Sequence, residues 1–191
     1  MIKHIYSDFF GVLASEVAPV WLPKHMSPEE AVAYKRDVVE QVDKGAITFS
    51  QLLAYLSAKT GVPPHQIKQE WYDLSYPHSD FIAYMYALKG KYDICLLSNA
   101  SSEFLRLLLD KHHLNDLFTH VFISAEVKMV KPNADFFLYA MNTMGFKPEE
   151  CLFVDDNPIN CEGAKKVGMH VVRYQNAMQV RREFETLGVT L

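Results

Sequence analysis

A set of polar side chains in this sequence stands at the ends of short apolar runs or, for Lys131, in the loop before a predicted helix, where a reactive site would be assembled. The set consists of Asp8, Ser98, Asn99, Lys131, Asp155 and Asp156. Asp155 and Asp156 are adjacent carboxylates that repel each other, and a hard cation such as Mg²⁺, which prefers oxygen ligands, relieves that repulsion. The acidic pair therefore predicts a magnesium site.

Asp8 is the candidate nucleophile of this set. Carboxylates attack phosphoryl groups to form aspartyl-phosphates, and the attack needs a cation because both reactants are negatively charged. Mg²⁺ held between Asp8, the acidic pair and a substrate phosphate would supply that charge. Lys131 would add a second positive charge, and the Ser98 hydroxyl would hold phosphoryl oxygens. These residue types favour phosphoryl transfer from a small phosphorylated molecule.

The apolar runs before these residues predict the strands that bring them together. We expect strands at 3–8, 92–99, 120–126, 151–157 and 169–174, separated from residue 92 onward by helices at 101–113, 133–145 and 157–168. The strands are mostly apolar rather than alternating, as in a parallel sheet that is buried on both faces. The alternation favours βαβ units and a doubly wound, Rossmann-like α/β sheet, whose ligands bind at the carboxyl ends of the strands.

Residues 14–88 interrupt this alternation, because they contain no convincing strand. Their patterns predict a loop at 14–26 and helices at 27–45, 48–61 and 63–75. Ser and Pro residues at the expected helix starts and glycines at the expected ends support these boundaries. We therefore expect an α/β core domain at 1–13 and 89–191 and a helical cap domain at 14–88.

Length and composition narrow the class of protein. The chain has 191 residues, of which 49% are hydrophobic and 22% charged, with a formal net charge of −4. These values suit one globular domain with a modest insertion, and no basic excess argues for a nucleic-acid partner. No apolar stretch is long enough to span a membrane, and the N-terminus lacks a signal peptide's features, so we expect a cytoplasmic protein. The sequence leaves the oligomeric state open.

The ordered segments "DFFGVL", "LLSNAS", "KP" and "VDDN" resemble the four motifs of the haloacid dehalogenase-like (HAD) hydrolase superfamily. The resemblance extends from Asp8 to Asp156, and the longer segment "VDDNPINCEGAKKVGMHVV" strengthens it. In detail the chain is similar to the branch of bacterial sugar-phosphate phosphatases and the N-terminal phosphatase domain of soluble epoxide hydrolases. The resemblance implies a Mg²⁺-dependent phosphatase with a small helical cap after the first motif.

The resemblance also assigns roles to single residues. Asp8 would be the nucleophile and Lys131 the lysine of the third motif, which the KP spacing favours over the nearby Lys128. Ser98 and Asn99 would bind phosphate as the second motif. The implied metal ligands are Asp8, the backbone carbonyl of Phe10, Asp156 directly, and Asp155 directly or through water.

Phe10 departs from the family pattern. Most phosphatases of this superfamily place an aspartate two residues after the nucleophile to protonate the leaving oxygen and activate water. Phe10 does neither, and general acid or base help is typically worth about 10²- to 10⁴-fold. Three hypotheses follow: a slow Mg²⁺-dependent phosphatase, a 2-haloacid dehalogenase, or a module that binds phosphate or a partner without turnover. The dehalogenases share the aromatic residue but carry a small, neutral fourth motif and a catalytic arginine, for which Arg36 is the only cap candidate.

The loop at 14–26 is the best candidate for substrate specificity, because it follows the first motif and is rich in proline. Its possible substrate contacts are Glu16, Trp21, Lys24 and His25. Among them, His25 is our candidate to replace the missing acid and base. We expect the other aromatic residues of the cap to serve mainly in packing.

Overall fold

The centre of the computed structural model, which describes residues 1–191, is a five-stranded sheet in the order β3-β2-β1-β4-β5. The strands are β1 (His4–Ser7), β2 (Asp93–Ser98), β3 (His120–Ile123), β4 (Cys151–Asp155) and β5 (His170–Arg173). Every neighbouring pair is parallel, and His4 pairs with Asp93 on one side and Cys151 on the other. The α/β parallel fold predicted from the sequence is confirmed. The chain reverses its direction of travel across the sheet between β1 and β4, which is where such sheets bind ligands.

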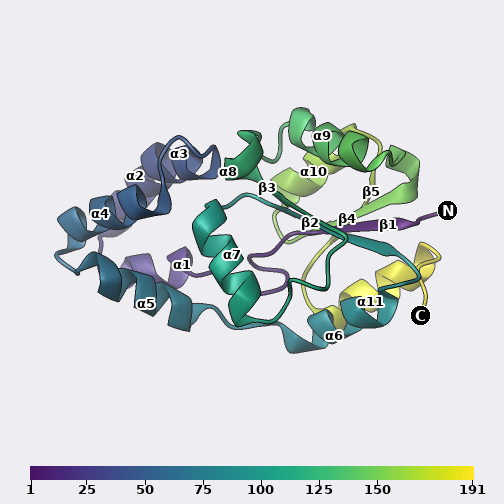
Figure 1. Ribbon diagram of the computed structural model, residues 1–191, viewed down its shortest axis with the longest axis horizontal. Helices are drawn as coiled ribbons and strands as arrows, with labels where there is room; N and C mark the ends of the chain where they lie inside the picture. Colours follow the sequence, from purple (N-terminus) through teal and green to yellow (C-terminus); the bar gives the residue numbers. More distant parts are fainter.

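Alternate side chains of the strands face two separate apolar layers. Ile5 and Leu152 belong to the larger core, and Tyr6 and Phe153 belong to the smaller one. Helices α6 (Ser79–Leu88), α7 (Ser102–Lys111) and α11 (Ala177–Thr186) cover the first face, and α9 (Ala134–Met144) and α10 (Pro158–Lys166) cover the second. In Figure 1, α9 and α10 lie above the sheet, and α6 and α11 lie below it.

The segment between β1 and α6 is helical and gathers at one end of the molecule, on the left of Figure 1. It contains α1 (Ala18–Trp21), the 3₁₀ turn η1 (Leu22–Lys24), α2 (Pro28–Tyr34), the π-helical turn η2 (Lys35–Val39), α3 (Glu40–Asp43), α4 (Phe49–Thr60) and α5 (Pro64–Leu74). Side chains fix the starts of two of these helices, because Ser27 with Glu30 and Thr48 with Gln51 form complete capping boxes.

The structure corrects several predicted boundaries. Residues 124–126, predicted as the end of a strand, begin the short helix α8 (Ser124–Val127), and the predicted loop at 14–26 contains α1 and η1. The helix predicted at 27–45 is divided by η2. A second 3₁₀ turn, η3 (Pro148–Glu150), precedes β4. Helices α6 and α11 were not predicted.

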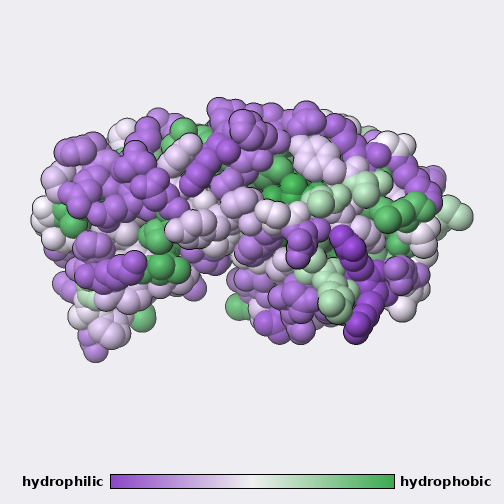
Figure 2. Space-filling model, turned by 90° about the horizontal axis from the view of Figure 1, so that it is seen from below, coloured by the Kyte–Doolittle hydropathy of each residue, from purple (hydrophilic) through white to green (hydrophobic).

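The position of α6 bears on the domain boundary. Although it lies within the predicted cap range 14–88, α6 packs against α11 and its Phe81 and Leu88 join the core beneath the sheet. We propose that the cap ends near residue 78. Seen from below, the outline is notched between the helical end and the sheet part, and small apolar patches interrupt a mostly hydrophilic surface (Figure 2). None of the helices combines the length and the apolar character needed to cross a membrane.

Candidate active site

Asp8 stands directly after the central strand, at the carboxyl edge of the sheet. Its backbone N–H donates to the Val154 carbonyl at 2.9 Å, which extends the β1–β4 ladder by one residue. The Phe9 backbone N–H donates to Asp8 Oδ1 at 2.7 Å, so one carboxylate oxygen is fixed. The Asp8 side chain is 11% exposed. The other oxygen, Oδ2, faces a lysine.

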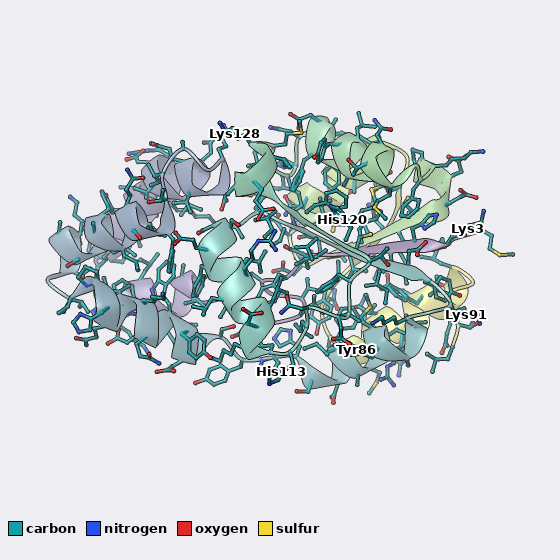
Figure 3. The ribbon with its side chains drawn as sticks, viewed as in Figure 1. Lys3, Tyr86, Lys91, His113, His120 and Lys128 are labelled. Carbon is teal, nitrogen blue, oxygen red and sulfur yellow. The ribbon has the colours of Figure 1, made fainter.

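Lys131 is the cation of the site. Its ammonium Nζ lies 2.9 Å from Asp8 Oδ2 and 2.7 Å from Asp155 Oδ2, and its side chain is completely buried. Burial opposes the charge of Lys131, but the carboxylates of Asp155 and Asp8 outweigh this effect and raise the pKa of the lysine. Lys128 is exposed, at the outer surface beside α8 (Figure 3). The structure therefore brings Lys131, and not Lys128, to the nucleophile candidate.

The amide of Asn99 holds the loop that carries Lys131. Asn99 Nδ2 donates to the Lys131 carbonyl, and the Lys131 N–H donates to Asn99 Oδ1, both at 2.9 Å. The residue after β2 is thereby tied to the segment before α9, although the two are far apart in the sequence. Asn99 thus positions the lysine, and its phosphate contact stays a prediction.

Ser98 ends β2 with a hydroxyl that is buried and has no hydrogen-bond partner within the chain. Leaving a buried hydroxyl unpaired costs free energy, which a ligand oxygen would recover. The neighbouring Asn99 lies on the wall of the cavity described below. Ser98 itself is fully buried and not part of that wall, so its phosphate contact stays a prediction.

The two carboxylates after β4 differ in how many donors they face. Asp155 is fully buried and accepts from Lys131, from the Asn157 N–H at 2.8 Å and from Asn160 Nδ2 at 3.1 Å. Asp156 is half-buried, and no other residue donates a hydrogen bond to its carboxylate. Burial and then Asp155 raise the pKa of Asp156. Asp156 is thus the carboxylate with oxygens free for a ligand.

The geometry of these oxygens fits a hard divalent cation. Ligand oxygens of Asp8, Asp155 and Asp156 lie within 4.8 Å of one another, and an all-oxygen donor set is the one Mg²⁺ prefers. The lack of a side chain at Gly11 leaves space for the Asp156 carboxylate, because a Cβ at Gly11 would lie 2.7 Å from the Asp156 carboxyl carbon. The φ of Gly11, +75°, also favours glycine at this position. The Phe10 carbonyl accepts no hydrogen bond within the chain. The three predicted carboxylate ligands are therefore brought together, and the role of the Phe10 carbonyl stays a prediction.

A cavity of about 970 Å³ opens above these residues, between the sheet edge and the helical segment. Asp8, Lys131 and Asp156 lie on its wall with Phe10. The Phe10 ring meets Phe9 edge-on at 5.0 Å and stacks on Phe104 at 6.4 Å. The Phe10 ring is therefore packed against aromatic residues at the cavity wall.

The predicted substrate contacts of the first loop are only partly on this wall. Glu16 lines the cavity, whereas Trp21, Lys24 and His25 do not. His25 stacks on Trp21 at 4.2 Å, and its Nε2 lies 3.7 Å from Glu70. The hypothesis that His25 replaces the missing acid and base is therefore wrong.

The cavity wall also carries charged residues that the sequence did not single out: Lys35, Asp43 and Arg173. Arg173 donates from Nε to the Asp156 carbonyl at 3.0 Å. Arg173 could have been suspected, because it ends the last strand at the same sheet edge. Lys35 and Asp43 follow helical patterns that do not indicate which side of the cap faces the core.

Several known proteins are similar to this chain in sequence. A D-ribitol-5-phosphate phosphatase of Bacteroides thetaiotaomicron is 21% identical over 204 residues, covering 98% of each chain. An (S)-2-haloacid dehalogenase 4A of Burkholderia cepacia is 25% identical over 171 residues, covering 87% of this chain and 73% of the relative. Two other curated relatives are much longer than the matched segments, which cover 35% and 17% of their lengths.

A solved structure shares the fold over almost the whole chain. A HAD family enzyme of Bacteroides thetaiotaomicron superposes with a TM-score of 0.83 at 24% identity, covering 96% of this chain and 98% of the other. The family model described as haloacid dehalogenase-like hydrolase matches residues 2–168, which include all the polar residues assembled at the sheet edge. The chain belongs to the haloacid dehalogenase-like hydrolases.

Proposed function

We propose that the protein is a Mg²⁺-dependent phosphatase that hydrolyses a small phosphomonoester through an aspartyl-phosphate on Asp8. The observation that carries the proposal is the contact of the buried Lys131 ammonium with both Asp8 and Asp155, beside the free carboxylate of Asp156. This arrangement places one positive charge against an Asp8 carboxylate oxygen at the wall of a cavity, and the three carboxylates leave negative charge for a divalent cation to offset. Phosphoryl transfer depends chiefly on positioning and charge stabilisation, which this site supplies.

In the first step, Asp8 Oδ2 attacks phosphorus, and the bond from phosphorus to the leaving oxygen breaks. The Phe9 N–H and Lys131 hold the carboxylate in place. The Ser98 hydroxyl donates to a phosphoryl oxygen. Water then attacks the aspartyl-phosphate, which releases inorganic phosphate and restores Asp8. The Phe10 side chain can neither give a proton to the leaving oxygen in the first step nor take one from water in the second.

Asp156, Asp8 and the Phe10 carbonyl would hold Mg²⁺, with Asp155 acting through water because its oxygens already accept from three donors. When bound, Mg²⁺ offsets the negative charge of Asp8 and of the substrate phosphate. Solved structures of the Bacteroides thetaiotaomicron enzyme were obtained in complex with magnesium and inorganic phosphate, which supports this proposal. The relative named D-ribitol-5-phosphate phosphatase supports a small phosphorylated substrate.

The experiment is a phosphatase assay with 4-nitrophenyl phosphate and a panel of sugar and polyol phosphates, in Mg²⁺ and in EDTA. We expect hydrolysis with Mg²⁺, none with EDTA, and none for Asp8→Asn. Asp80→Asn, which changes an exposed carboxylate outside the cavity wall, serves as the matched control. A rate that is independent of metal would contradict the proposal. Phosphate binding without turnover of any substrate would favour a binding module instead.

The alternative of a 2-haloacid dehalogenase draws on Phe10 and on the dehalogenase relative. It also needs a catalytic arginine from the cap, and Arg36, the only cap arginine, does not meet that need. Arg36 is exposed and pairs with Asp37 at 2.5 Å, outside the cavity wall. Release of halide from 2-chloropropionate would favour this alternative.

A further inference from the structure

One carboxylate of the helical segment, Asp43, shares the cavity wall with Asp8. Asp43 ends α3 and is half-buried. Its neighbours Glu40 and Lys44 pair with each other at 2.5 Å, and no hydrogen bond or ion pair of the chain engages the Asp43 side chain. A carboxylate that is largely withdrawn from water and left unpaired lowers stability. An unpaired, half-buried carboxylate on a cavity wall is therefore a candidate for a role in binding or catalysis.

The end of α3 packs against helix α8 of the α/β core. Helix α8 follows β3 directly (Figure 1). Gly45 has a φ of +66° and lies so close to α8 that a Cβ would collide with the Ala125 carbonyl oxygen. This close approach of two backbones holds Asp43 at the carboxyl edge of the sheet, the edge at which Asp8 also stands.

The charges around Asp43 allow it to carry a proton near neutral pH. Burial raises the pKa of Asp43 to about 7, opposed by Lys131 and reinforced by Glu16 and Glu40. Other charged side chains come from the elements that pack around Asp43. Lys35 lies on the cavity wall, Arg36 pairs with Asp37, and Glu126 pairs with Arg106. The remaining titratable neighbour is the buried phenol of Tyr34, whose pKa is raised by burial and by Asp43. A general acid works best with a pKa near the operating pH.

We propose that Asp43 is the general acid and base that replaces the aspartate missing at position 10, a role that rests on the phosphatase function proposed above. As Asp8 attacks phosphorus and the bond to the leaving oxygen breaks, the Asp43 carboxylic acid gives its proton to that oxygen, and an alcohol departs. The Asp43 carboxylate then takes a proton from the water that attacks the aspartyl-phosphate. The products are inorganic phosphate, free Asp8 and protonated Asp43, so the cycle closes.

Glu16 is the other carboxylate of the helical segment on this wall, and it serves the role less well. It is exposed, and it belongs to the loop just after the first motif. Asp43 is less exposed than Glu16, although burial and then Asp156 raise the pKa of Glu16 as well. Glu16→Gln is therefore the comparison variant.

The test separates proton transfer from other contributions by the leaving group. The ratio kcat/KM reports steps up to formation of the aspartyl-phosphate, and 4-nitrophenolate departs without a proton whereas an alkoxide does not. For Asp43→Asn we expect kcat/KM to fall about 10²- to 10⁴-fold on glycerol phosphate but less than about 10-fold on 4-nitrophenyl phosphate. Asp80→Asn, which changes an exposed carboxylate outside the cavity wall, should match wild type on both substrates, and Asp43→Glu should recover part of the loss.

Two results would overturn this role while leaving the phosphatase proposal intact: equal losses on both substrates, or Asp43→Asn behaving like Asp80→Asn while Asp8→Asn is inactive. The same leaving-group signature in Glu16→Gln and not in Asp43→Asn would also overturn it. No Mg²⁺-dependent hydrolysis by wild type would instead refute the phosphatase proposal, and the role of Asp43 with it.

Discussion

The ammonium of Lys131 lies between two carboxylates, 2.9 Å from Asp8 Oδ2 and 2.7 Å from Asp155 Oδ2. All three side chains are buried or nearly so. A charge in such surroundings is tolerated only when it is paired, so each member of the triad depends on the other two. This relationship ties the stability of the sheet edge to the chemistry proposed for it.

Lys131→Met should therefore impair both folding stability and activity. Removing the ammonium leaves Asp8 and Asp155 without their common partner, and breaking a buried ion pair typically costs about 3–5 kcal/mol. Urea unfolding at neutral pH measures the loss, and phosphatase assays should show activity near background. Lys128→Met removes an exposed lysine from the same loop region and should change neither quantity. Equal behaviour of the two variants would contradict the triad.

Gly11→Ala tests the room around the acidic pair. A Cβ at Gly11 would lie 2.7 Å from the Asp156 carboxyl carbon, so Asp156 must move and the affinity for Mg²⁺ should fall at least about 10-fold. Gly90→Ala is the matched control, because Gly90 also has a positive φ, +92°, but nothing lies within 4 Å of its Cβ position. Both variants should lose about 1–2 kcal/mol to backbone strain. Only Gly11→Ala should lose metal affinity, as measured by titrating activity with Mg²⁺.

Phe10→Asp should supply the proton carrier that the chain lacks at this position. We expect a higher kcat/KM on glycerol phosphate, and we expect Phe10→Asp to make that rate insensitive to a second change, Asp43→Asn. Phe10→Asn removes the ring without adding an ionisable group and is the control. If Phe10→Asp and Phe10→Asn gave the same rates, the missing proton at position 10 would not be what limits the reaction.

The pKa of Asp43 also predicts a pH dependence of stability. Its folded-state pKa is raised to about 7, above the value of about 3.9 for a free aspartate. The folded protein then binds more protons than the unfolded chain between these values, so Asp43 makes stability fall as pH rises through about 4 to 7. In urea unfolding, the free energy of unfolding of Asp43→Asn minus that of wild type should be more positive near pH 8 than near pH 4. A pH-independent difference between the two proteins would contradict the shift.

Much of the sheet edge was predictable because buried parallel strands are marked by short apolar runs, and the residues that follow them must meet at one edge. Asp8, Ser98 and the acidic pair were found in this way, and Lys131 was found from the KP motif in the loop before a predicted helix. The pairing of Lys131 with Asp155, and the hold of Asn99 on the lysine loop, depend on side-chain directions that strand boundaries do not specify.

The helical segment was harder to predict, for two physical reasons. Its helices are recognisable, but which face of each is turned to the cavity depends on packing across the cap–core boundary, so Asp43 went unnoticed and His25 was wrongly chosen. The end of α3 is placed by a contact between Gly45 and Ala125, which are 80 positions apart. Local patterns carry no information about a contact at that separation.

The central claim is that Asp8 becomes covalently phosphorylated, and acid-quenched mass spectrometry tests it most directly. Wild type incubated with Mg²⁺ and 4-nitrophenyl phosphate should carry one phosphoryl group on the peptide that contains Asp8, and hydroxylamine should remove it. The Asp43→Asn variant should accumulate more of this species, because water activation is slowed. Turnover with no phosphoryl group on that peptide, or full activity in Asp8→Asn, would contradict the account.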